Sequence, residues 1–214
     1  MPDDRRSSGV MDNEAEITLG VLSAVGENSA LTQRSLARDL GIALGLANAY
    51  LKRCAKKGLV KVAQVPPNRY AYYLTPTGFA EKSRLTAEYL TQSFKFFRAA
   101  RSQCGDLFGR CRDRGWCDVA LVGVSDLGEI ATFVARDHPV RLVGFVDRAT
   151  NATTFAGLPV SRDLGLLGGV DAALITDVRE PQAAFSAAAQ VLRPERVLTP
   201  PLLKIARPGL DQGS

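Results

Sequence analysis

Apolar and polar residues follow the period of short helices over the first part of the chain, and then that of paired strands. Helical spacing covers three stretches, residues 14–25, 33–40 and 44–57. Thr32 is an N-cap residue for the second stretch, and Gly41 supplies a turn between the second and the third. Strand-like runs at 59–65 and 70–74 flank a turn that contains two prolines. We therefore predict three helices and a hairpin over residues 13–76, after a disordered tail at 1–12.

Two short helices joined by a glycine turn, with a hairpin behind them, are typical of a winged helix-turn-helix. In the third helix Ala47, Leu51 and Cys54 share one face and are expected to pack inward. The other faces carry small and basic side chains, which suit the major groove of DNA, and Arg69 near the hairpin turn suits a minor groove. The residues expected to contact DNA are Gln33, Arg34, Gly45, Asn48, Ala49, Lys52, Arg53, Lys56 and Arg69.

Residues 77–115 contain no proline and predict one long helix, acting as a dimerisation or linker helix. Its heptad-like seam consists of Ala87, Leu90, Phe94, Phe97, Arg101, Cys104, Phe108 and Cys111. The seam could pair two chains or pack on its own chain. We expect a homodimer, because helix-turn-helix domains usually read two half-sites. Cys104 and Cys111 are expected to be core residues, with a redox pair across two chains as the alternative.

Strand-like and helical runs alternate from residue 116 to 205. Strands are expected at 118–124, 141–146, 171–177 and 196–198, and helices at 129–136 and 181–192. This alternation predicts a Rossmann-like parallel sheet as a second domain, followed by a tail at 206–214. The fold class is therefore a two-domain α/β protein: a winged helix-turn-helix, a long linker helix and a parallel sheet.

The first turn of the second domain reads Gly123-x-Ser125-x-x-Gly128, and Asp147 follows nineteen positions after Gly128. Such a turn brings a phosphate to a helix N-terminus, and an acid at the end of the next strand binds a ribose. Ser125 replaces the central glycine, which weakens the case for dinucleotide binding, and Asp126 adds a negative charge. The candidate cofactor-binding residues are Gly123, Ser125, Asp126, Leu127, Gly128, Asp147 and Asp177.

Charge separates the two halves. Residues 1–115 carry 18 Lys and Arg against 11 Asp and Glu, whereas residues 116–214 carry 9 against 11. A basic cluster confined to one half indicates a polyanionic partner such as double-stranded DNA, although a solvated helix face has the same composition. No apolar run is long enough to span a membrane, and the N-terminus lacks the apolar core of a signal peptide. With four cysteines in 214 residues, the expected location is the reducing cytoplasm.

The first half resembles MarR-type winged-helix regulators, and most of all a subgroup associated with exopolysaccharide gene clusters. The resemblance covers about residues 14–100. It is carried by Gln33-Arg34-Ser35-Leu36-Ala37, Leu51-Lys52-Arg53, Lys57-Gly58-Leu59-Val60 and Tyr73-Leu74-Thr75-Pro76-Thr77-Gly78. It implies a bacterial, dimeric, DNA-binding transcription regulator.

The second half is similar to the Rossmann-like domains of redox-sensing repressors and to nucleotide-sugar-binding segments of sugar-modifying enzymes. The first likeness implies NAD(H) and the second a nucleotide-linked sugar, so the sequence leaves the cofactor open. A domain that only mediates assembly is a further alternative. We expect no catalytic residues, because no proton-transfer group follows the cofactor fold; the rival is a small NAD-dependent oxidoreductase with a DNA-binding appendage. We expect no metal site, because Cys104, Cys111 and Cys117 lack paired C-x-x-C spacing and His138 is remote from them.

Overall fold

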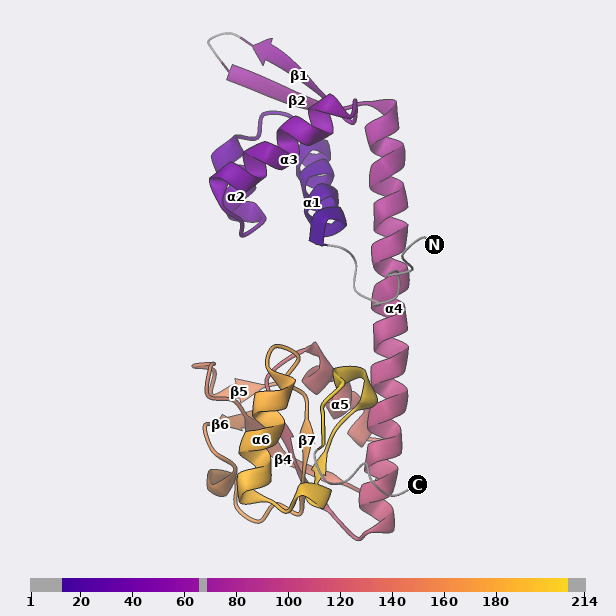
Figure 1. Ribbon diagram of the computed structural model, residues 1–214, viewed down its shortest axis with the longest axis vertical. Helices are drawn as coiled ribbons and strands as arrows, with labels where there is room; N and C mark the ends of the chain where they lie inside the picture. The colour runs from indigo at the N-terminus through magenta and orange to yellow at the C-terminus, as the bar shows by residue number, and fades with distance from the viewer. Residues whose placement is uncertain (1–12, 66–68, 208–214) are drawn as a thin grey trace, which may run out of the picture. The chain divides into compact units, whose positions relative to one another are not determined.

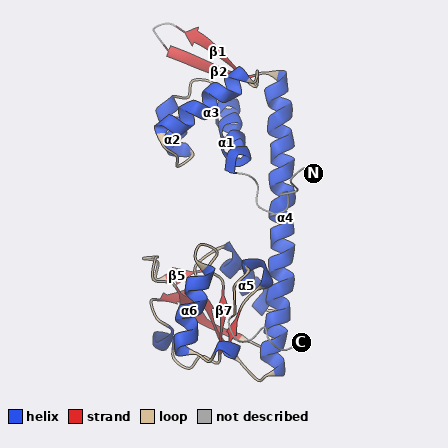
Figure 2. Ribbon diagram, in the orientation of Figure 1, coloured by secondary structure: helices blue, strands red, loops and turns tan. Residues whose placement is uncertain are grey.

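The computed structural model describes residues 13–65 and 69–207, and the chain forms two units, Met1–Lys95 and Phe96–Ser214 (Figure 1). The expected tail at 1–12, most of the tail at 206–214 and the tip of the predicted hairpin turn lie outside the described residues. The predicted fold class is confirmed, with a winged helix, a long helix and an α/β sheet domain in that order (Figure 2). No helix within the described residues is both long and apolar enough to span a membrane.

The first unit contains three helices, a two-stranded sheet and the first part of a long helix. Their bounds are α1 Asn13–Glu27, α2 Gln33–Asp39, α3 Leu44–Lys56, β1 Val60–Val65, β2 Arg69–Leu74 and α4 Pro76–Asp113. Thr32 caps α2, since its hydroxyl accepts a hydrogen bond from the Ser35 N–H at 3.0 Å. Gly41 has φ 63°, a conformation that glycine adopts without strain, and this allows the tight turn into α3.

One apolar core joins all elements of the first unit. It includes Val21 and Leu22 of α1, Leu36 of α2, Leu51 of α3 and Leu85 of α4, each no more than 3% exposed. The inward stripe predicted for the third helix is confirmed, because Ala47, Leu51 and Cys54 are all buried. This packing turns the opposite face of α3 toward solvent.

The second unit is a six-stranded sheet with helices on both faces. It contains β3 Asp118–Val122, α5 Asp126–Ala135, β4 Arg141–Val146, β5 Thr154–Phe155, β6 Leu158–Ser161, η1 Leu164–Leu167, β7 Ala172–Ile175, α6 Pro181–Val191, η2 Pro194–Arg196, β8 Val197–Leu198 and η3 Pro201–Leu203. The strands lie in the order β5-β6-β4-β3-β7-β8, and all neighbours are parallel except β5 and β6. Leaving out β5, the order is 3-2-1-4-5, which is a doubly wound arrangement.

Alternate residues of the central strand face the two helical layers. Val119 and Leu121 pack with α5 and the second part of α4, whereas Ala120 and Val122 pack with α6 and η1.

β5 was not predicted from the sequence. It arises from a two-residue hairpin in which Ala156 and Gly157 both have positive φ, and alanine gives little sequence signal for such a turn.

The prediction that the whole seam of α4 pairs two chains is wrong for the second part of this helix. Cys104, Phe108 and Cys111 are fully buried in the core of their own sheet domain, so this half of the seam packs within the chain and does not pair two chains. The expectation that both cysteines are core residues is confirmed. Burial raises the pKa of Cys104 to about 12 and that of Cys111 to about 11, although Arg110 opposes the latter shift. Both thiols are therefore protonated and unreactive at neutral pH.

Candidate functional site

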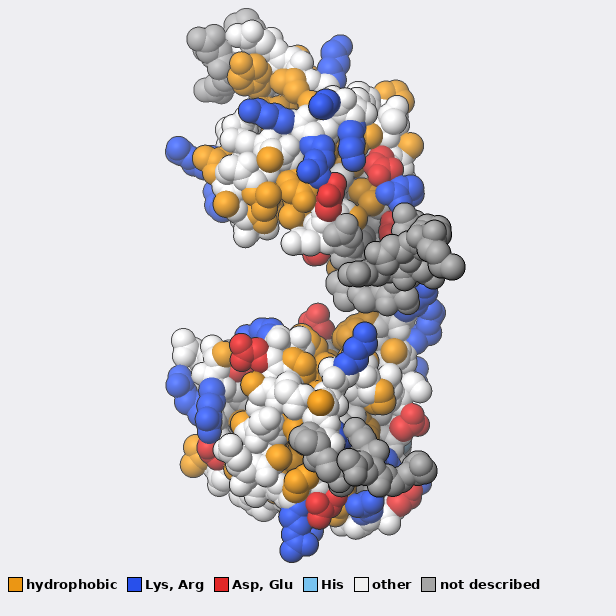
Figure 3. All heavy atoms as spheres, viewed as in Figure 1, with side chains coloured by type: hydrophobic (Ala, Val, Ile, Leu, Met, Phe, Trp, Pro, Cys, Tyr) orange, Lys and Arg blue, Asp and Glu red, His pale blue; other side chains and the backbone are white. Residues whose placement is uncertain are grey.

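The outward face of α3 combines small and basic side chains. Gly45, Ala49, Lys52 and Lys56 are all exposed and follow each other at steps of four, three and four residues, which places them on one stripe opposite the buried one. Lys and Arg side chains gather over α3 in Figure 3. The helix therefore presents a positively charged face on a rigid core.

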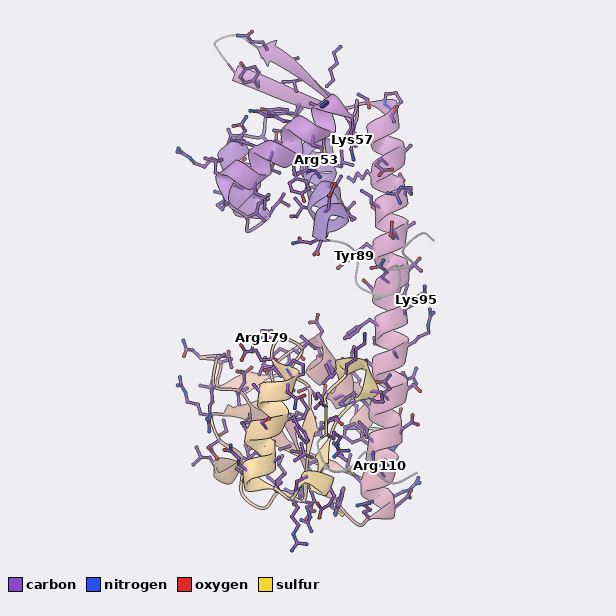
Figure 4. All side chains as sticks on the ribbon, viewed as in Figure 1. Arg53, Lys57, Tyr89, Lys95, Arg110 and Arg179 are labelled. Atoms are coloured by element: carbon purple, nitrogen blue, oxygen red, sulfur yellow. The ribbon has the colours of Figure 1, made fainter. Side chains whose placement is uncertain are left out.

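Arg53 differs from the lysines because it is engaged within the unit. Its guanidinium forms an ion pair with Glu14 of α1 and lies 5.1 Å from the ring centre of Tyr50 (Figure 4). These contacts fix its position beside α1. Lys57, the C-cap residue of α3, is exposed and adds a further charge at the same end of the helix.

The remaining predicted DNA contacts lie around α3. Arg34 is exposed on α2, and the Gln33 side-chain amide donates to the Tyr72 hydroxyl at 3.4 Å, which links α2 to the hairpin. Asn48 is half-buried, and its Oδ1 has no hydrogen-bond partner among the described residues. Arg69 begins β2, but its side chain lies outside what the structure describes.

In the second unit the glycine-rich turn holds the strand ends together. Gly123 has φ 105°, and a Cβ there would lie 2.4 Å from backbone atoms of Asp177, so only glycine fits. A Cβ at Gly128 would lie 2.6 Å from the Phe145 ring, and this glycine thus allows α5 to pack closely on the sheet. Leu127 beside it is fully buried, whereas Asp126 is exposed.

Ser125 occupies the place of the central glycine and caps α5. Its hydroxyl accepts from the Gly128 N–H at 3.2 Å and donates to the Thr176 carbonyl at 2.5 Å. The helix consequently begins at Asp126, earlier than the predicted Glu129. One of the N–H groups that a phosphate would use is therefore already satisfied by the protein.

Asp147, at the end of β4, is 6% exposed and ties three loops together. One carboxylate oxygen accepts from the Val124 N–H and from Arg179, both at 3.0 Å, and the other accepts from the Ala149 N–H at 2.7 Å. Burial raises the pKa of Asp147, but these N–H groups and the Arg179 guanidinium lower it more, so its pKa lies below the ordinary value. The carboxylate is ionised and satisfied by the protein.

A cavity of about 230 Å³ opens beside these strand ends, on the α6 side of the sheet. Of the candidate cofactor-binding residues, Gly123, Asp147 and Asp177 line it, whereas Ser125, Asp126, Leu127 and Gly128 do not. Asp177 accepts from the backbone N–H groups of Arg179 and Glu180, at 2.8 and 2.9 Å, and so orders the turn into α6.

The sequence did not indicate most of the cavity lining. One wall is an apolar face of α6 formed by Ala183, Ala184, Ala187, Ala188 and Val191. Arg148, Asp163 and Glu180 lie on the rim. Small residues at helical spacing were the only available signal, and they equally describe a helix that packs closely on a sheet.

Comparison with known proteins agrees with the fold of the first unit. Residues 14–61 match the family model described as winged helix-turn-helix DNA-binding. None of the curated proteins matches the chain.

Among solved structures, the chain is similar to the PcaV transcriptional regulator from Streptomyces coelicolor in complex with its natural ligand, with 22% identity over 38% of this chain and 59% of that one and a TM-score of 0.36. It is also similar to a MarR family protein of Mycobacterium tuberculosis in complex with p-aminosalicylic acid, with 19% identity over 37% of this chain and 61% of that one and a TM-score of 0.34. A complex of Staphylococcus aureus MepR with DNA is similar with 23% identity over 40% of this chain and 62% of that one, and its TM-score is 0.34. The chain thus spans about three fifths of the length of these proteins, and each likeness covers less than half of the chain. The family match and the observed elements together identify residues 14–61 as part of a winged helix-turn-helix domain.

Proposed function

We propose that the protein is a bacterial, cytoplasmic transcription regulator of the MarR type that binds double-stranded DNA through α3. The observation that carries this proposal is the exposed stripe of Gly45, Ala49, Lys52 and Lys56 on a helix held by a buried opposite face. A helix of this kind enters the major groove, where small residues allow close approach and lysines meet phosphates. The match of residues 14–61 to a DNA-binding winged helix supports the same function.

The salt dependence of DNA binding tests this function. Replacing both Lys52 and Lys56 by alanine should weaken binding, and it should lower the slope of log affinity against log salt by about 1 for each phosphate that the variant no longer neutralises. Lys95→Ala removes an exposed lysine of α4 outside the helix-turn-helix and is the matched control. Equal affinity and equal slope in the double variant and the wild type would contradict the assignment of α3.

The protein acts as a homodimer in this proposal, because two copies of α3 are needed to read two half-sites of a DNA duplex. Leu90 and Phe94 of α4 belong to the half of the predicted seam that is not buried in the sheet domain, and they are 46% and 58% exposed. Their spacing of four residues puts them on one helix face. They are the candidate dimer contacts.

The sheet domain senses a nucleotide-type metabolite, NAD(H) or a nucleotide-sugar, in the cavity beside β3, β4 and β7. Support comes from the 3-2-1-4-5 strand order and from the position of the cavity at the carboxyl ends of the strands, where doubly wound sheets bind ligands. The alanine-rich wall of α6 leaves room for a flat ring, and carboxylates on the rim can accept hydrogen bonds from hydroxyl groups. Ser125 at the start of α5 reduces the room for a phosphate there.

Calorimetry with NADH, NAD⁺, ATP and UDP-sugars tests the sensor. Ala187→Phe should fill the cavity and abolish binding of whichever ligand binds the wild type, whereas Ser186→Phe, on an exposed position beside it, should not. If no ligand binds the wild-type protein, the sheet domain is an assembly domain. Turnover of NADH with a substrate would instead favour the oxidoreductase.

A further inference from the structure

The first half of α3 presents almost only apolar side chains to solvent. Leu44 and Leu46 are 45% and 42% exposed, and Gly45 and Ala49 are exposed as well. A Cβ added at Gly45 would meet no protein atom within 4 Å, so the backbone is open to a close partner at this position. These four residues, 44, 45, 46 and 49, form the apolar tip of α3.

The charged side chains of α3 lie outside this region. Asn48 is the one polar side chain between residues 44 and 49, and its carbonyl oxygen is buried without a hydrogen-bond partner among the described residues. The exposed cations Lys52, Lys56 and Lys57 all lie in the second half of the helix or directly after it. Arg53 is paired with Glu14. The helix is therefore divided into an apolar tip and a basic end.

The lysines at the basic end of α3 indicate which kind of partner the whole helix contacts. The same helix carries its lysines toward one end, and these favour the phosphates of a polyanion over the surface of an ordinary protein. In a helix-turn-helix, which α2 and α3 form here, the N-terminal residues of the second helix contact the base edges. Residues further along that helix contact the DNA backbone. The major-groove edge of a base pair offers an apolar group at one place only, the 5-methyl group of thymine.

We propose that the apolar tip of α3 recognises thymine methyl groups in the major groove, so that sequence preference depends on apolar contacts of Leu44, Leu46 and Ala49 rather than on hydrogen bonds to base edges. The inference rests on the proposed DNA-binding function and names the chemistry that its specificity uses. Gly45 brings the helix backbone close to the bases, and the lysines of the basic end hold phosphates.

The test uses the full chain and the duplex that it selects from a random pool. Replacing thymine by deoxyuridine in the selected duplex removes only the methyl group and leaves base pairing and the O4 acceptor unchanged. Burying one such group is worth about fourfold in affinity, so replacing two contacted thymines should weaken binding roughly tenfold or more. Leu44→Ala and Leu46→Ala should bind the thymine duplex more weakly and lose part of the sensitivity to deoxyuridine.

Leu166→Ala is the matched control, since this leucine is 76% exposed on η1 of the other unit and should leave both affinities unchanged. Salt-dependent binding to a random duplex should be the same in all variants, which shows that each is folded. A selected duplex that tolerates deoxyuridine at every position, or one without thymine, overturns the inference while the DNA-binding function stands. Unaltered DNA binding by both leucine variants would also overturn it and would leave a protein partner as the occupant of the apolar tip. If no duplex binds even at low salt, both the function and the inference fail.

Discussion

Asp147 shows how a residue in a ligand-binding position can also hold the fold together. Its sequence position after the second strand of the sheet domain predicts contact with a ribose, and its carboxylate does line the cavity. In the structure both oxygens are already used, by two backbone N–H groups and by Arg179. A ligand hydroxyl would therefore have to share the carboxylate or displace Arg179, whose side chain is 57% exposed.

Asp147→Ala should consequently destabilise the sheet domain, in addition to any effect on a ligand. The change leaves the N–H groups of Val124 and Ala149 without their acceptor, which should cost about 2–3 kcal/mol at pH 7. Because the pKa of Asp147 is lowered in the folded state, its stabilisation is present above the unfolded pKa of about 4 and is lost as the pH falls through the folded value. Urea unfolding at pH 7 and below pH 4 measures the difference between wild type and variant, which should narrow in acid.

Asp126→Ala is the control for this measurement. Asp126 is an exposed carboxylate in the first turn of α5, and its loss should cost less than about 1 kcal/mol through the helix dipole. A cost for Asp147→Ala no larger than that for Asp126→Ala would mean that the three hydrogen bonds contribute little to stability.

The run Thr75-Pro76-Thr77-Gly78 determines how helix α4 begins. The Thr75 hydroxyl donates to the Gly58 carbonyl at 2.6 Å and accepts from the Gly78 N–H at 3.0 Å. A Cβ at Gly78 would lie 1.9 Å from the Leu59 carbonyl oxygen. Proline suits the first turn of a helix, and glycine is needed here because α4 begins in contact with the chain that enters β1. The run therefore joins the β1–β2 hairpin to the long helix α4.

Gly78→Ala should destabilise the winged-helix unit by about 2–3 kcal/mol, because either α4 or the backbone at Leu59 must move. Gly109→Ala, in the same helix, meets no atom within 4 Å and should stabilise the protein by up to about 1 kcal/mol, since alanine favours helix over glycine. Thermal unfolding followed by circular dichroism measures both. Equal effects of the two substitutions would show that the contact with Leu59 is not rigid.

Elements with a clear period could be predicted from the sequence, and elements fixed by distant contacts could not. The three helices and the hairpin of the first unit follow from apolar spacing and from Thr32 and Gly41. The 3,4 spacing of α4, by contrast, describes any helix with one apolar face, and it cannot distinguish a second chain from the sheet domain that buries Cys104. The same holds for the cavity, whose α6 wall and rim residues come together only through the strand order.

The two units divide the chemistry of the protein between them. The basic first unit carries the exposed face of α3, and the second carries a cavity with four carboxylates, Asp147, Asp163, Asp177 and Glu180, and Arg148 among its lining residues. The basic surface of the first unit favours DNA, and the carboxylates of the cavity disfavour DNA. This separation supports one unit for DNA and another for a small ligand that carries hydroxyl groups and a flat ring.

Two copies of the chain are expected to pair through the exposed face of α4. Phe94 is 58% exposed on α4, and if it pairs two chains, Phe94→Asp would bury two unpaired carboxylates in the interface. Burial of an unpaired charge costs several kcal/mol, so the dimer dissociation constant should rise by at least about 100-fold. Sedimentation velocity should show a dimeric wild type and a monomeric variant. Phe133→Asp, at a phenylalanine of α5 that is 53% exposed, should remain dimeric.

DNA binding should also distinguish the monomeric variant from the dimeric wild type. The monomer should lose affinity for duplexes with two half-sites and retain its weak affinity for one half-site, because α3 itself is unchanged. A monomeric wild type, or a dimer that survives Phe94→Asp, would place the contact between copies elsewhere or rule it out, and the two copies of α3 would then have to meet their half-sites independently.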